Sequence, residues 1–77
     1  MKELILMIAE SLVDRPDEVE VTEVRGDNTT VLELKVAKED LGKVIGKQGR
    51  NISALRTIVF AVNAKQGGKR ARLDVID

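Results

Sequence analysis

The sequence contains no cysteine and no histidine, and these two absences exclude several kinds of chemistry. Without cysteine the chain has no disulfides, no thiolate metal ligands and no thiol nucleophile, which fits a reducing compartment. Without histidine it also lacks the residue that most often serves as general base and as metal ligand. We therefore expect no catalytic residue, no metal site, no cofactor and no small-molecule substrate.

Long apolar segments are also absent. The longest apolar run, residues 4–9, is far too short to cross a bilayer, and no basic segment with a small-residue cleavage site surrounds it. The sequence therefore predicts a soluble cytoplasmic protein that does not contact membranes. Residues 1–77 are enough for one domain, and a domain of this size buries only about 60% of its unfolded surface.

Negative charge is missing from most of the second half of the chain. The net charge is zero, but residues 1–40 carry −6 and residues 41–77 carry +6. No Asp or Glu lies between residues 41 and 73, so this region can attract an anion although the whole chain is neutral. The alternative is an ordinary solvated surface. The cations of this region are Lys43, Lys47, Arg50, Arg56, Lys65, Lys69, Arg70 and Arg72.

Apolar periodicity predicts three helices. Residues 2–13 place most of their apolar side chains on one helical face, and Pro16 prevents the helix from continuing. Asp40 is expected to act as the N-cap of a short helix over residues 41–45. A single apolar stripe predicts a longer helix over residues 50 to about 65, which Gly67-Gly68 ends.

Three strands are predicted from β-branched and alternating residues. Residues 19–24 and 31–36 flank the turn-forming Gly26-Asp27-Asn28 and indicate a hairpin. Val24 breaks the alternation of the first strand, so we expect a bulge or a twist near the turn. Residues 71–75 alternate again and predict a last strand. The order helix, strand, strand, helix, helix, strand indicates an α+β fold.

The most informative motif is the sequence Val-Ile-Gly-Lys-Gln-Gly-Arg-Asn-Ile at residues 44–52. Gly46 and Gly49 can adopt positive φ and allow another chain to approach the backbone closely. Between two helices, such a loop brings N–H groups to the positive end of the next helix, where Lys47 and Arg50 add charge. These features suit a phosphate backbone, although paired glycines also occur in plain helix–helix turns. A nucleotide-handling enzyme is not favoured, because no Ser or Thr follows the lysine.

Residues 44–52 resemble the signature of the KH domain, whose GxxG loop clamps about four nucleotides of single-stranded nucleic acid. Similarity at residues 12–16, 19–21, 42–50 and 56–57 extends the resemblance to the small stand-alone KH proteins of bacteria, along nearly the whole chain. The resemblance implies a single type II KH domain of order α-β-β-α-α-β. In such a domain a three-stranded mixed sheet packs against three helices.

The same resemblance implies a non-catalytic RNA-binding protein with broad sequence tolerance, acting as an RNA chaperone or post-transcriptional regulator. Its expected partners are single-stranded RNA and either a second copy or a larger Jag-type KH protein. Target RNAs and the preference for RNA over single-stranded DNA stay open. Matched residue by residue, the motif places Gly46, Lys47, Gln48 and Gly49 in the clamp, Ile45 and Ile52 in an apolar groove, and Lys43, Arg50 and Arg56 at basic positions around it.

Phe60 is the only aromatic residue and does not belong to this groove, so stacking is weak and low affinity is expected. It projects away from the apolar stripe of its helix, beside small residues. We therefore predict a partner interface, most simply a homodimer, formed by Thr57, Ile58, Phe60 and Ala61. One alternative is that Phe60 folds back over the rim of the core. Another is that the protein is an interaction scaffold acting through the Phe60 face, with RNA binding secondary.

Overall fold

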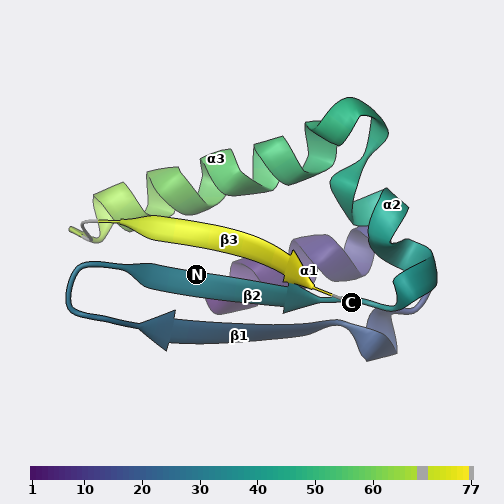
Figure 1. Cartoon of the computed structure of the whole chain (residues 1–77), viewed down its shortest axis with the longest axis horizontal. Coiled ribbons are helices and arrows are strands. Elements are labelled where there is room, and N and C mark those ends of the chain that lie inside the picture. The colour runs from purple at the N-terminus through teal and green to yellow at the C-terminus, as the bar shows by residue number, and fades with distance from the viewer. Residues whose placement is uncertain (68–69, 77) are drawn as a thin grey trace.

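The computed structural model describes residues 1–67 and 70–76 and packs a three-stranded sheet against three α-helices (Figure 1). This confirms the expected α+β fold and its element order. The helices are α1 (Lys2–Leu12), α2 (Leu41–Ile45) and α3 (Arg50–Lys65), and the strands are β1 (Glu20–Arg25), β2 (Thr30–Lys35) and β3 (Ala71–Ile76). Short 3-10 turns that were not predicted, η1 (Pro16–Glu18), η2 (Lys38–Asp40) and η3 (Lys47–Gly49), join these elements.

The sheet is mixed, with strand order β1-β2-β3. β1 is antiparallel to β2, and Val21 lies opposite Leu34. β2 is parallel to β3, and Leu32 lies opposite Leu73. A parallel pair needs a crossover connection, which η2, α2, η3 and α3 provide here. In Figure 1, α3 runs beside β3, whereas α1 lies behind the sheet.

The bulge predicted at Val24 is wrong. β1 pairs with β2 in an unbroken register from Glu20 to Arg25, and Val24 lies opposite Val31. Because side chains alternate along a strand, Val24 points to the face opposite that of the buried Val21, and it is 53% exposed. Glu23 instead occupies the helix-facing position, where its carboxylate pairs with Arg25.

The core lies between one face of the sheet and the helices. α1 contributes two fully buried residues, Ile5 and Ala9, and the sheet contributes Leu32, Leu34 and Leu73. α3 contributes its predicted stripe, of which Ile52, Leu55 and Val59 are buried. This packing holds α3 against the sheet and so fixes the position of the glycine loop at its N-terminal end.

α3 ends close to the predicted position. Its last residue is Lys65, and Gly67 follows with φ 78° while donating its N–H to the carbonyl of Ala64. Gly68 and Lys69 lie outside the described residues. Among residues 1–67 and 70–76, none of the helices is long and apolar enough to span a bilayer.

Candidate nucleic-acid interface

The glycine loop joins α2 to α3 through three departures from helical geometry within residues 46–49. Gly46 has φ 77° and ψ 170°, Gln48 has φ 58° and ψ 27°, and Gly49 has φ 73° and ψ 16°. The positive φ expected at both glycines is confirmed. Gln48 was not expected to share it, and within the described residues no other non-glycine residue does so.

Position 46 requires glycine for two reasons, its backbone angles and the lack of room for a Cβ atom. A Cβ atom at this position would lie 2.7 Å from Cγ and 2.9 Å from the backbone nitrogen of Asn51. Asn51 in turn donates its side-chain N–H to the carbonyl of Lys43, at 2.8 Å. This bond satisfies one of the carbonyls left open at the end of α2. Sequence reasoning missed Asn51, although an amide side chain just after the loop was a usable signal.

Some backbone amides of the loop donate hydrogen bonds within it, and others at its tip do not. Gly46 donates to the carbonyl of Gly42 at 2.8 Å, and Gly49 donates to the carbonyl of Gly46 at 3.1 Å. Lys47 and Gln48 are the first two residues of η3, and the N–H groups at the start of such a turn have no acceptor within it. The amides best placed for an anion are therefore those of Lys47 and Gln48.

The side chains at the tip are polar and accessible. Lys47, Gln48 and Arg50 are all exposed, and the Arg50 guanidinium donates to the Gln48 side-chain carbonyl at 3.5 Å. Within the described part of the chain, neither Lys47 nor Arg50 forms an ion pair. Both cations are thus free to neutralise phosphate.

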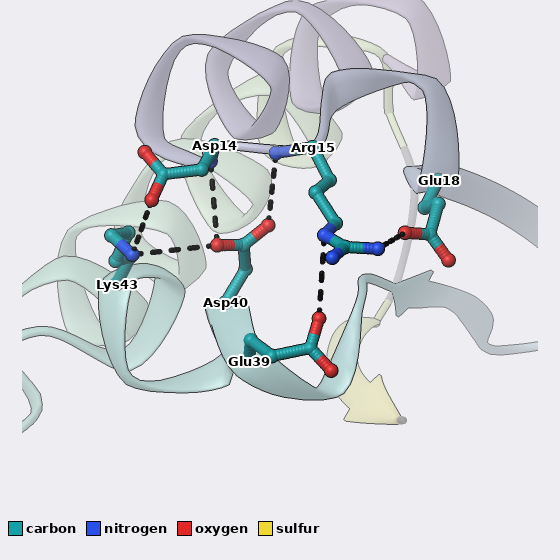
Figure 2. Close-up of polar contacts among 6 residues, drawn as sticks. All are labelled: Asp14, Arg15, Glu18, Glu39, Asp40 and Lys43. Atoms are coloured by element: carbon teal, nitrogen blue, oxygen red, sulfur yellow. Dashed lines mark hydrogen bonds and ion pairs between the residues drawn. The ribbon is translucent and has the colours of Figure 1, made fainter.

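Lys43 lies on α2, and its side chain is directed toward Asp14 and Asp40 (Figure 2). Its ammonium lies 2.8 Å from a carboxylate oxygen of Asp14 and 3.5 Å from one of Asp40. The hydrogen bond and charge of Asp14, followed by those of Asp40, raise the pKa of Lys43 despite partial burial. Its contact with RNA stays a prediction, and these two carboxylates compensate its charge.

Asp40 is not the side-chain cap predicted for α2, because its carboxylate binds a different segment. Only 1% of the residue is exposed, and it accepts hydrogen bonds from the amides of Arg15 at 3.0 Å and Asp14 at 3.3 Å. Burial alone would raise the pKa of Asp40, but these amides and Lys43 outweigh it and hold that pKa below its ordinary value. Beside them, the Arg15 guanidinium pairs with Glu18 and Glu39 (Figure 2).

The remaining predicted RNA contacts divide between groove and core. Ile45 is 40% exposed and forms an apolar wall beside the loop, whereas Ile52 is 9% exposed and belongs mainly to the core. Arg56 donates from Nε to the carbonyl of Leu73 at 3.2 Å. This bond places Arg56 on the side of α3 that faces β3.

The predicted partner residues lie along α3. Phe60 is 70% exposed, so its ring does not fold back over the core. Thr57 and Ala61 are exposed as well, while Ile58 is half-buried. The structure therefore leaves an accessible surface of small and apolar side chains on this helix.

A protein-family model described as the KH domain of KhpA and KhpB matches residues 2–75. The chain belongs to this KhpA/KhpB family. Its members are RNA-binding KH proteins and not enzymes, which confirms the resemblance and the non-catalytic class inferred from the motif.

Family members from several bacteria match along the whole chain. RNA-binding protein KhpA of Clostridium acetobutylicum is 55% identical over 76 residues, covering 99% of this chain and 100% of the relative. RNA-binding protein KhpA of Listeria monocytogenes is 48% identical over 77 residues, covering 100% of both. The protein of the same name from Chlamydia pneumoniae is 47% identical and covers 100% of this chain and 97% of the relative.

Solved structures support the fold of this family member. Aquifex aeolicus Era bound to GDP and AlF4⁻ matches with a TM-score of 0.64 and 23% identity, over 96% of this chain and 29% of Era. Era in complex with MgGDPNP and nucleotides 1506–1542 of 16S ribosomal RNA matches with a TM-score of 0.61 and 21% identity, over 97% of this chain and 30% of Era. The chain thus corresponds to less than a third of Era.

Proposed function

We propose that the protein is a cytoplasmic RNA chaperone or post-transcriptional regulator that clamps the backbone of single-stranded RNA with residues 46–49. The observation that carries this proposal is the conformation of the loop. Positive φ at Gly46, Gln48 and Gly49 leaves the amides of Lys47 and Gln48 at an exposed tip. Lys47 and Arg50, which form no ion pair with the residues that the structure describes, lie beside those amides.

The proposed strand places its phosphates at the loop and its bases against Ile45. Phosphate contacts fix the position of a strand, whereas contacts with bases determine which sequences are preferred. Because Ile45 offers apolar contact and no hydrogen bonds through its side chain, broad sequence tolerance follows. Arg56 lies further along α3, on the side that faces β3. Lys43 contributes less, because two carboxylates bind its ammonium.

The double variant Lys47→Asp/Gln48→Asp tests the clamp. Two carboxylates at the loop tip repel phosphate, so binding of a short single-stranded RNA should be lost. Asp tolerates the left-handed conformation that position 48 requires, so the fold should be kept. Fluorescence anisotropy measures binding, and helical CD with a melting curve checks the fold. For the wild type, neutralising about three phosphates predicts a log–log salt slope near −2.

The chain offers a matched control, because Lys65 and Gln66 repeat the same two residues at the other end of α3. Lys65→Asp/Gln66→Asp makes the same change in net charge on exposed residues outside the loop. It should retain binding of short RNA. Equal affinity of the folded loop variant and the wild type would contradict the assignment.

We also propose that the exposed face of α3 pairs with a second copy or with a larger Jag-type KH protein. The supporting observation is the exposure of Phe60, Thr57 and Ala61, beside the half-buried Ile58. A shallow hollow on the same helix is lined in part by Ala61. Pairing through this face would leave the glycine loop at the N-terminal end of α3 accessible.

A further inference from the structure

The carbonyl of Lys43 lies where α2 ends and the glycine loop begins. In an α-helix each carbonyl accepts a hydrogen bond from the N–H four residues later, and Gly46 still donates in this way to the carbonyl of Gly42, at 2.8 Å. The next bond of the series would join the Lys47 N–H to the Lys43 carbonyl. Because Gly46 adopts φ 77° and ψ 170°, the chain leaves the helix there, and this bond is not made within residues 1–67.

The side chain of Asn51 supplies the donor that the Lys43 carbonyl would otherwise lack. Its amide donates to that carbonyl at 2.8 Å, across a separation of eight residues. The same side chain fills the space beside Gly46, where an added Cβ atom would lie 2.7 Å from the Asn51 Cγ. Asn51 therefore connects the end of α2 to the start of α3 and closes the loop between them.

This bond has a consequence for the backbone amide of Lys47. The last carbonyls of a helix need donors from outside it, and for Lys43 the alternative donor is the Lys47 N–H, which a longer α2 would use. With the Asn51 amide bound, the Lys43 carbonyl already has a partner. The loop can then keep the left-handed angles that end α2, and the Lys47 N–H stays at the exposed tip.

We propose that Asn51 is a positioning residue for the clamp. By binding the Lys43 carbonyl, its amide prevents α2 from gaining a further hydrogen bond and keeps the Lys47 N–H available to a phosphate. The inference rests on the proposed function, because the phosphate is that of the clamped RNA. Asn51 itself needs no contact with RNA in this role. Without its amide, the Lys47 N–H would bind the Lys43 carbonyl, and the loop would offer one donor fewer to the strand.

Asn51→Leu tests this role, because Leu has nearly the shape of Asn and no hydrogen-bond donor. The affinity for a four-nucleotide single-stranded RNA, measured by fluorescence anisotropy, should fall about tenfold, which is the scale of one hydrogen bond to a charged group. Amide hydrogen exchange followed by NMR is the second measurement. The Lys47 amide should exchange more slowly in the variant than in the wild type, because it gains an acceptor. Asn51→Ala also lacks the donor and should cause both changes.

Ser11→Ala is the matched control, because Ser11 also donates from its side chain to a helix carbonyl, that of Met7 at 3.0 Å, but on α1. It should change neither the RNA affinity nor the exchange of the Lys47 amide.

The exchange measurement separates positioning from general stability. Weaker RNA binding together with faster exchange throughout the chain would show that Asn51 only stabilises the fold, and the positioning role would be wrong. RNA binding that Asn51→Leu leaves unchanged and Lys47→Asp/Gln48→Asp abolishes would overturn the positioning role alone. RNA binding that neither variant weakens would overturn the clamp as well.

Discussion

At the scale of single residues, the two glycines of the loop serve different physical needs. Gly46 combines φ 77° with ψ 170°, a region that is essentially restricted to glycine, and it also lies against Asn51. Gly49 has ordinary left-handed angles, and the nearest atom to an added Cβ is 3.9 Å away. Gly46 is therefore needed for space and conformation, and Gly49 for conformation alone.

Replacing the glycines one at a time should show this difference. Gly49→Ala should cost about 1–2 kcal/mol of unfolding free energy, the usual penalty for a left-handed non-glycine residue. Gly49→Asn should cost less, because Asn tolerates this conformation. Gly46→Ala should cost more than either, since the new Cβ displaces Asn51. Urea denaturation measures all three, and equal losses for the two alanine variants would contradict the distinction.

The sequence predicted these glycines correctly because a glycine signal is local, and periodicity predicted the helices and strands for the same reason. It failed where a contact joins segments distant along the chain. Asp40 has the position of an N-cap, but its carboxylate binds the amides of Asp14 and Arg15, some 25 residues earlier. Lys43 was assigned to RNA because its pairing with Asp14 is equally non-local.

At the scale of elements, Asp40 joins two parts of the fold through hydrogen bonds, in addition to their packing in the core. One part is the connection from α1 to η1, and the other is η2 with α2, the helix that leads into the loop (Figure 2). The carboxylate is buried and accepts hydrogen bonds from two backbone amides. These bonds require its negative charge and stabilise it where water is excluded. The bridge and the buried Val44 together hold α2, and with it Ile45, in place.

Asp40 should make stability depend on acidity. Its pKa is lower in the folded protein than the usual unfolded value of about 3.9, so its contribution is fully present above that value. The contribution is lost as the pH falls through the folded pKa. Asp40→Asn should lower the melting temperature at neutral pH and weaken the fall in stability on acidification. Thermal melts from pH 7 to pH 3 measure both effects.

Asp14→Asn is the control for this bridge, because the Asp14 side chain is largely exposed while its backbone amide still donates to Asp40. Its melting temperature should change less than that of Asp40→Asn at every pH. An Asp40→Asn variant as stable as the wild type at neutral pH would show that the bridge contributes nothing to the fold.

At the scale of the whole molecule, charge and exposed apolar surface define what one copy can bind. The acidic first half of the sequence and the basic second half restrict the attraction for RNA to the part built from residues 41–76. A single clamp of about four nucleotides without an aromatic wall binds weakly. Two clamps on a pair of associated chains would bind one long strand more tightly, because binding at the first clamp raises the effective concentration of RNA at the second.

Self-association should therefore depend on the exposed face of α3 and should affect long RNA more than short RNA. Ala61→Glu places a charge on this face, away from the glycine loop, and should shift the protein to monomer. Sedimentation over a range of concentrations measures this shift, and Met7→Glu on α1 is the control. The monomeric variant should keep its affinity for a four-nucleotide RNA and lose affinity for a strand long enough to reach two clamps. A wild-type protein that stays monomeric at high concentration would remove the proposed pairing with a second copy and leave the clamp unaffected.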